Sequence, residues 1–253
     1  MYANYHTHTF RCHHARGTER EYIEQALEAG MKILGFSDHV PYSFPNGHDS
    51  GFRMYFSDLE DYIITLAALR DEYKSEIQIF TGFEAEYYPD LFDEMLNMIG
   101  QYEYDYLLLG QHFVGNEIGT PFSGSPTDSE ADLKNYVDQT LEAMKTGRFL
   151  YLTHPDTLNY TGAHDIYREH MTRLCIGAKE TDTPLEINFL GMGDHRHYPN
   201  DAFFKIAAEN GNQVIFGCDA HYPEALNDPE TLAACEALVI RNNLKLIDRM
   251  VLK

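Results

Sequence analysis

Short apolar runs alternate along the chain with longer segments in which apolar residues recur every three or four positions. The apolar runs predict buried strands, whereas the longer segments predict amphipathic helices. Strands are predicted up to residue 8 and over 32–37, 77–83, 104–109, 149–153, 184–188 and 213–217. Helices are predicted over 18–30, 57–73, 89–99, 129–145, 165–179, 200–210 and 229–241. The segment 244–252 is compatible with either state.

Capping signals mark several helix ends. Glu21 follows Thr18 by three residues, and Glu60 follows Ser57 by three, which is the spacing of a capping box. We therefore predict N-caps at Thr18 and Ser57. Gly211 stands just after the helix predicted over 200–210, where a left-handed glycine commonly ends a helix.

Strict alternation of strands and helices implies parallel strands joined by crossovers. Polar candidate ligands follow six of the seven strands, whereas an open doubly wound sheet gathers its ligands at one switch point. Six strand ends converge only if the sheet closes. The pattern therefore predicts an α/β fold, a (β/α)7 distorted TIM-like barrel with a metal site at the C-terminal face of its strands. No linker or repeat divides the chain, so residues 1–253 are predicted to form one domain.

Composition narrows the possible partners and the compartment. The 253 residues are 43% hydrophobic, and 19 basic against 40 acidic residues give a net charge of −21. Nucleic acids and anionic membranes bind basic surfaces, so neither is expected as a partner. Four cysteines without a C-x-x-C pair indicate reduced thiols in a cytoplasmic protein. No signal peptide is recognisable, and no apolar run approaches the roughly 18 residues of a membrane helix.

Histidines and carboxylates at the strand ends indicate a metal site. His6 and His8 are two positions apart in an extended segment, so their side chains point to one face. Later strands are followed by His39, Glu84, His112, His154, Asp219 and His221. Each alone is compatible with an ordinary surface or core residue, but so many converging imidazoles would lack partners without a metal.

The donor types favour particular metals and a particular chemistry. Imidazole and carboxylate without thiolate suit Zn, Fe or Mn better than Mg or Ca. The ligands are too many for one ion, so we predict two or three divalent ions bridged by a carboxylate. Such clusters lower the pKa of bound water towards about 7, and they stabilise both the attacking and the leaving oxygen of a displacement reaction. The donor set therefore predicts hydrolysis.

The same residues carry a family resemblance. The motifs His6-Thr-His8, His14, Asp38-His39, Gly82-Phe-Glu84, His112, Thr153-His154-Pro155 and Asp219-Ala-His221 resemble those of the PHP (polymerase and histidinol phosphatase) superfamily. The resemblance extends over nearly the whole chain. It implies that His6, His8, Glu84 and Asp219 hold one metal, that Glu84, His112 and His154 hold a second, and that His14, His39 and His221 hold a third. Glu84, Asp219 and His221 are predicted to be catalytic.

The segments 35–41, 53–73 and 82–89 resemble the histidinol-phosphatase branch in particular. The predicted reaction is hydrolysis of L-histidinol phosphate to L-histidinol and phosphate by a metal-bound hydroxide, within histidine biosynthesis. The resemblance also suggests that an arginine after the sixth strand grips the substrate phosphate. Arg196 is the best match, since a guanidinium forks onto phosphate oxygens, although a plain surface arginine is the alternative.

Other functions remain as alternatives. The chain is also compatible with a PHP phosphoesterase that acts on another small phosphate ester. An amidohydrolase-type deacylase also uses His-x-His on a barrel, but that class commonly bridges its metals with a modified lysine at a strand end, and no lysine here stands at such a position. A non-catalytic PHP module would need a partner, and the apparently complete ligand set favours an enzyme.

Overall fold

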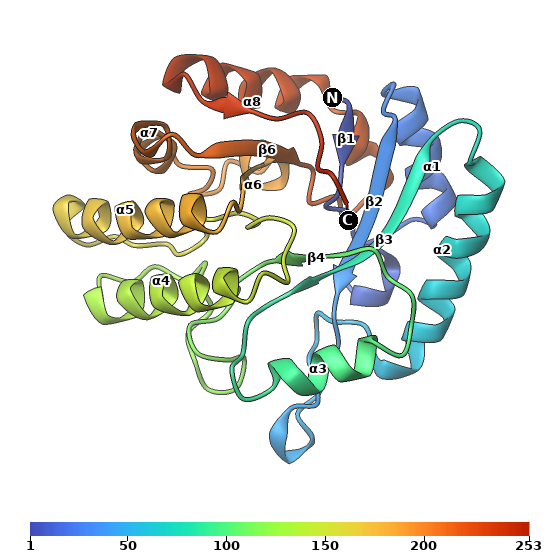
Figure 1. Ribbon diagram of the computed structural model, residues 1–253, viewed down its shortest axis with the longest axis horizontal. Helices are drawn as coiled ribbons and strands as arrows, with labels where there is room; N and C mark the ends of the chain where they lie inside the picture. The colour runs from blue at the N-terminus through green and yellow to red at the C-terminus, as the bar shows by residue number, and fades with distance from the viewer. Residues whose placement is uncertain (253) are drawn as a thin grey trace. The chain divides into compact units, whose positions relative to one another are not determined.

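The computed structural model describes residues 1–252, and at position 46 it describes the backbone alone. It confirms the predicted α/β class (Figure 1). The strands are β1 (Ala3–Asn4), β2 (Ile33–His39), β3 (Gln78–Ala85), β4 (Tyr106–Leu109), β5 (Leu185–Asn188), β6 (Gln213–Gly217) and β7 (Lys245–Leu246). The helices are α1 (Glu19–Glu28), α2 (Leu59–Tyr73), α3 (Phe92–Ile99), α4 (Glu130–Lys145), α5 (His164–Glu180), α6 (Phe189–Gly193), α7 (Asp201–Asn210) and α8 (Pro229–Asn242). Short 3₁₀ helices are η1 (Phe10–Cys12), η2 (Pro45–Gly47), η3 (Phe56–Asp58) and η4 (Pro223–Asn227).

One predicted strand is wrong. Over 149–153 the structure forms no strand, and Leu152 alone makes bridges, parallel to Leu109 and to Leu185. The chain turns immediately afterwards, because His154 has a φ of 26° in the left-handed region. The segment therefore joins its neighbours by a few hydrogen bonds but ends before a ladder can form.

Capping at α1 is confirmed, whereas the cap predicted at Ser57 is wrong. The Glu21 carboxylate accepts from the backbone N–H of Thr18 at 2.6 Å, which completes the capping box. Before α2 the chain forms η3, and the Asp58 carboxylate accepts from the backbone N–H of Tyr55 at 3.0 Å. A carboxylate is a stronger acceptor than a hydroxyl, so it captures the free amide at this helix start. Helix α6 and turn η4 were not predicted because they are too short to show a period.

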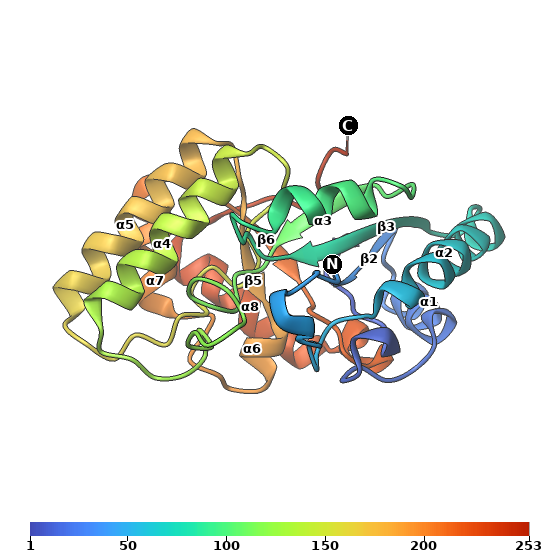
Figure 2. The same cartoon turned by 90° about the horizontal axis from the view of Figure 1, so that it is seen from below.

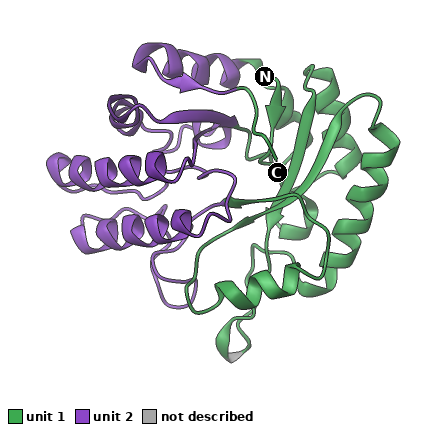
Figure 3. Cartoon of the chain, in the orientation of Figure 1, with its two compact units in different colours: residues 1–108, 217–229, 248–253 green, residues 109–216, 230–247 purple. Residues whose placement is uncertain are grey.

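Contacts group the chain into two compact units (Figure 3). Unit 1 comprises residues 1–108 and 217–229 together with the C-terminal segment that begins at Asp248. Unit 2 comprises residues 109–216 and 230–247. The hydrogen-bonded sheets have the orders β1-β2-β3-β4 and β5-β6-β7. The closed seven-stranded barrel and the single domain over residues 1–253 stay predictions.

In unit 1 the strands β1, β2 and β3 are parallel, and α1 and α2 lie along them (Figures 1 and 2). The buried Tyr106 ring crosses the sheet, where its hydroxyl donates to the carbonyl of Tyr5 at 2.7 Å. A Cβ at Gly82 would come within 2.6 Å of that ring, so glycine makes room for the tyrosine. The Tyr62 hydroxyl of α2 donates to the Gly82 carbonyl at 2.8 Å and fixes this helix on β3.

In unit 2 the bridges of Leu109, Leu152 and Leu185 continue into β6 and β7, and β6 and β7 are parallel. Helices α4 and α5 pack against each other, and α5 packs against α7 (Figures 1 and 2). The C-terminus of α7 is closed by Gly211, which has a φ of 72°. This confirms the predicted glycine cap.

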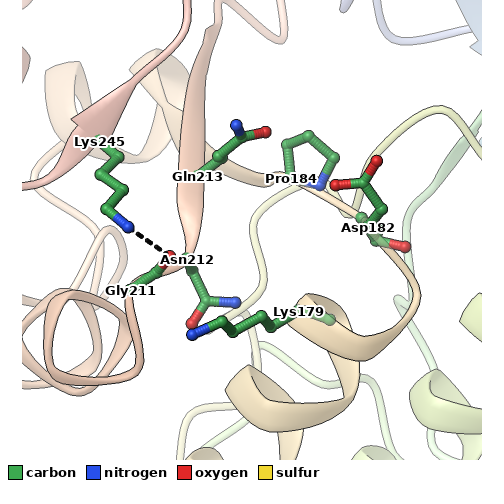
Figure 4. A pocket seen from close by; sticks show the side chains of 9 residues that line it. Lys179, Asp182, Pro184, Gly211, Asn212, Gln213 and Lys245 are labelled. Carbon is green, nitrogen blue, oxygen red and sulfur yellow. Dashed lines mark hydrogen bonds between the residues drawn. The ribbon is translucent and has the colours of Figure 1, made fainter.

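A cavity of about 200 Å³ lies at the amino ends of β5 and β6 (Figure 4). Two lysines of its lining cap the end of α7. Lys179 donates to the carbonyl of Asn210 at 2.8 Å, and Lys245 donates to that of Gly211 at 3.4 Å. These contacts satisfy helix-terminal carbonyls with cations, which stabilises the helix end. The predicted ligands of unit 2 follow the carboxyl ends of its strands, so this cavity is not the candidate active site.

No helix within residues 1–252 is both long enough and apolar enough to cross a membrane. The four cysteines are buried free thiols, as the sequence predicts.

Candidate metal centre

Neighbouring chain segments bring the predicted ligands of unit 1 side by side. The segment 6–8 lies between β2 and the segment 219–221. Thr7 accepts a hydrogen bond from the backbone of Ser37 at 2.8 Å on one side, and it pairs in parallel with Ala220 on the other. Strand β3 follows on the far side of β2. Because parallel strands end at the same edge, the side chains that follow them gather there.

Glu84 lies at the centre of the first cluster. Its Oε2 atom is 3.1 Å from Nδ1 of His39. The same oxygen is 3.5 Å from Nε2 of His6 and 3.6 Å from Nε2 of His8. All four side chains are buried. A buried carboxylate that faces three ring nitrogens has the position expected of a ligand shared between metal ions.

Asp219 forms the second part of the cluster. Its Oδ1 atom is 3.1 Å from Nε2 of His8 and 3.5 Å from Nε2 of His6. The ligand atoms of these three residues lie within 4.8 Å of one another. Asp219 has a φ of 50°, a left-handed conformation that is uncommon outside glycine and typical of functional sites.

Three histidines form a further group. The ligand atoms of His14, His39 and His221 lie within 4.8 Å of one another, and the Nε2 atoms of His14 and His221 are 2.9 Å apart. His14 is exposed, so this group borders solvent. Three imidazoles whose ring nitrogens converge match the donor set of a zinc, iron or manganese ion.

Asp38 has a role that the sequence analysis missed. Its Oδ1 atom lies 3.4 Å from Nδ1 of His8. Its other oxygen accepts from the backbone N–H and the hydroxyl of Thr9. A carboxylate on Nδ1 fixes the tautomer of a ligand histidine and leaves Nε2 for the metal. The buried strand end carries an acidic residue, and this was the signal available in the sequence.

The charges of the cluster set its protonation states. Burial opposes charge on His8, but hydrogen bonds to Asp219 and Asp38 raise its pKa to about 9. Burial, together with the adjacent charge of His8, lowers the pKa of His221 to about 3. Burial also opposes ionisation of Asp219, but the neighbouring histidines hold its pKa well below the usual value. An ionised Asp219 and a neutral His221 are the forms that bind metal, whereas His8, whose pKa is about 9 without an ion, must release a proton for its Nε2 atom to bind one.

Cys12 lies close enough to His8 and His221 to be considered as a ligand. Burial raises the pKa of its thiol, and its Sγ atom donates to the carbonyl of Thr9 at 3.1 Å. A thiol that stays protonated is a poor ligand. The prediction of a thiolate-free site is therefore retained.

The remaining two predicted histidine ligands lie in unit 2. The rings of His112 and His154 have centroids 4.8 Å apart. The backbone N–H of His154 donates to the Glu186 carboxylate at 2.9 Å. The Oγ1 atom of Thr157 lies 2.6 Å from Nδ1 of the His154 ring. Glu186 and Thr157 were missed by the sequence analysis, although a glutamate inside the apolar strand 184–188 was a usable signal.

Arg196 follows α6 in unit 2 and is exposed. Its guanidinium is paired with Asp194 at 2.7 Å, and Nη1 donates to the hydroxyl of Tyr198 at 3.0 Å. The Tyr198 ring is 5.9 Å from the ring of His154. Tyr198 therefore connects Arg196 with the surroundings of His154, a predicted metal ligand.

Comparison with known proteins adds an independent line of evidence. The family model of the PHP domain matches residues 4–190. A probable histidinol-phosphatase of Deinococcus radiodurans is 29% identical over an alignment of 227 positions, and the match covers 86% of this chain and 85% of that protein. A probable histidinol-phosphatase of Schizosaccharomyces pombe is 26% identical over 245 residues, covering 86% of this chain and 80% of that protein.

A solved structure has a similar fold. The crystal structure of histidinol phosphate phosphatase from Lactococcus lactis, complexed with zinc, L-histidinol and phosphate, matches with a TM-score of 0.76. The two sequences are 20% identical, and the match covers 97% of this chain and 95% of that one.

Proposed function

The chain belongs to the PHP domain family, and on that basis we propose that it is a metal-dependent phosphatase that hydrolyses L-histidinol phosphate. The observation that carries the proposal is the buried cluster of unit 1, where Glu84 and Asp219 face the imidazoles of His6, His8 and His39. The names of the relatives and the ligands of the similar crystal structure support L-histidinol phosphate as the substrate.

We assign the proposed ligands as the family resemblance implies. In unit 1 these are His6, His8, His14, His39, Glu84, Asp219 and His221. His112 and His154 of unit 2 complete the proposed set. When bound, clustered zinc, iron or manganese ions activate water at neutral pH and neutralise phosphate charge. The (β/α)7 barrel, the single domain over 1–253 and the cytoplasmic location remain parts of the proposal.

The residues of the chain have distinct proposed roles. Glu84 would bind more than one ion, because its Oε2 atom faces ring nitrogens of three histidines. Asp38 holds Nδ1 of His8, so that Nε2 faces Asp219. Asp219 and His221 are proposed to contact the reacting groups together with Glu84. Burial lowers the pKa of His221, because a protonated imidazole would lose its hydration there. The proposed role of His221 is therefore that of a neutral hydrogen-bond donor or acceptor.

Metal content is the first test. We expect two or three zinc, iron or manganese ions per chain after purification without chelators, because the ligands form more groups than one ion can occupy. Elemental analysis of the protein, with phosphate release measured on the same sample, checks this. A content below one ion per chain contradicts the proposal. Turnover of amides or lactones without any phosphomonoester turnover would instead identify a deacylase.

Replacement of Arg196 tests the proposed phosphate contact. Arg196→Ala is expected to keep the metals and to lower kcat/KM for the best phosphomonoester by about 10- to 100-fold, the effect of one lost charge-assisted contact. Arg196→Lys is expected to recover only part, because an ammonium group does not fork. Arg168→Ala, which breaks an exposed pair with Glu209 in the same unit, is the matched control. Wild-type kinetics in Arg196→Ala would remove this residue from the site.

A further inference from the structure

The loop that follows β2 places an aromatic ring beside the histidine group of unit 1. The Phe52 ring lies edge-on to His39, with centroids 5.1 Å apart and planes at 85°. It also meets His14, with centroids 6.4 Å apart. Phe52 is half-buried and His14 is exposed, so the ring stands where the candidate metal group borders solvent.

A buried ion pair holds this ring in place. The Arg53 guanidinium lies 4.4 Å from the centre of the Phe52 ring and covers one side of it. Arg53 is 1% exposed and pairs with Glu86 at 2.7 Å. It also donates to the hydroxyl of Tyr88 at 3.3 Å. The next residue, Met54, donates its backbone N–H to the carbonyl of His39 at 3.4 Å. The segment that carries Phe52 is therefore attached to the ends of β2 and β3, the strands that carry His39 and Glu84.

An apolar ring in this position has a chemical consequence. The surrounding ligands are polar and suit a phosphate, whereas Phe52 offers no hydrogen bond and suits a flat apolar or heteroaromatic group. Aromatic pairs prefer edge-to-face or offset contacts, which add to the burial of their area. A ring attached close to the phosphate of a substrate would meet Phe52 in this way.

We propose that Phe52 is a specificity-determining residue, the wall of a leaving-group subsite that favours phosphomonoesters with a flat ring. This inference rests on the proposed phosphatase function and deepens it. Arg53 and Glu86 act as positioning residues, because Arg53 packs on the Phe52 ring and Glu86 pairs with Arg53. The ring of the preferred substrate packs on Phe52 while its phosphate faces the metal ligands.

Three aminoalkyl phosphates test the proposal on the metal-loaded full chain. L-Histidinol phosphate carries an imidazole, L-phenylalaninol phosphate carries a phenyl ring, and L-alaninol phosphate carries no ring. Phe52→Ala is expected to lower kcat/KM about 10-fold for the two ring-bearing substrates and less than 2-fold for L-alaninol phosphate. Phe52→Tyr, which keeps the flat ring, is expected to stay close to wild type, and Phe52→Leu to fall between.

Controls separate a subsite from a structural role. Phe56→Ala removes an exposed ring of η3, four residues further along the chain, and is expected to leave all three rates unchanged. Metal content, measured on every variant, is expected to stay at the wild-type value. Equal losses for all three substrates, or loss of metal in Phe52→Leu, would overturn the subsite. Absence of any phosphate release by the wild type would instead overturn the proposed function itself.

Discussion

Replacing Glu84 by glutamine is expected to lower kcat for the best phosphomonoester by about 1,000-fold or more and to remove more than one metal ion per chain. The substitution keeps the size and shape of the side chain but removes its negative charge. The measurements are elemental analysis and phosphate release, made on variant and wild type purified in parallel.

The geometry around Glu84 explains the size of this effect. One carboxylate oxygen faces His6, His8 and His39 within 3.6 Å, and the side chain is 1% exposed. A glutamine amide offers one neutral oxygen and an NH2 group with two N–H donors, and this group cannot bind a metal. Loss of a shared ligand also removes the charge that offsets repulsion between neighbouring ions. More than one site is therefore expected to empty.

Glu86→Gln is the matched control for this experiment. Glu86 is also buried and lies two residues further along, and its carboxylate pairs with Arg53 at 2.7 Å. We expect this variant to keep its metals while losing stability. Full metal content and activity in Glu84→Gln would show that Glu84 is no ligand. Loss of metal from both variants alike would point to general disruption of this strand end.

Glu86→Ala is expected to lower the free energy of unfolding by about 3–5 kcal/mol, the cost of breaking a buried ion pair from one side. Arg53 is 1% exposed, and its charge would lose the carboxylate that lies 2.7 Å away. Rings surround the guanidinium, with the Tyr42 centre at 5.1 Å and the Phe52 centre at 4.4 Å, and they keep water away from it. Urea unfolding of the metal-loaded variant and wild type measures the difference.

Removal of both charges gives the control for this second prediction. The double variant Arg53→Met with Glu86→Leu is expected to recover most of the lost stability, because two apolar side chains of similar volume leave no buried charge. If Glu86→Ala unfolds at the same urea concentration as wild type, the pair contributes little.

Local rules account for what the sequence predicted well. The alternation of apolar runs with helical periods gave the α/β class, and the Thr18–Glu21 spacing gave the capping box of α1. His6 and His8 were expected to aim at one place, and both lie within 3.6 Å of Glu84. Strand period and cap spacing depend on residues only a few positions apart, so both can be recognised in the sequence.

By itself, then, the sequence determined the class of fold, the donor types and the strand ends where the donors stand. The tertiary structure decided which groups meet. Asp38 adjoins His39 in sequence but contacts His8 on the neighbouring segment. Arg53 pairs with Glu86, thirty-three residues away, and so presents Phe52 to the histidines. Contacts of this kind depend on the register between strands and on loop packing, and a shift of one residue would turn every side chain to the other face.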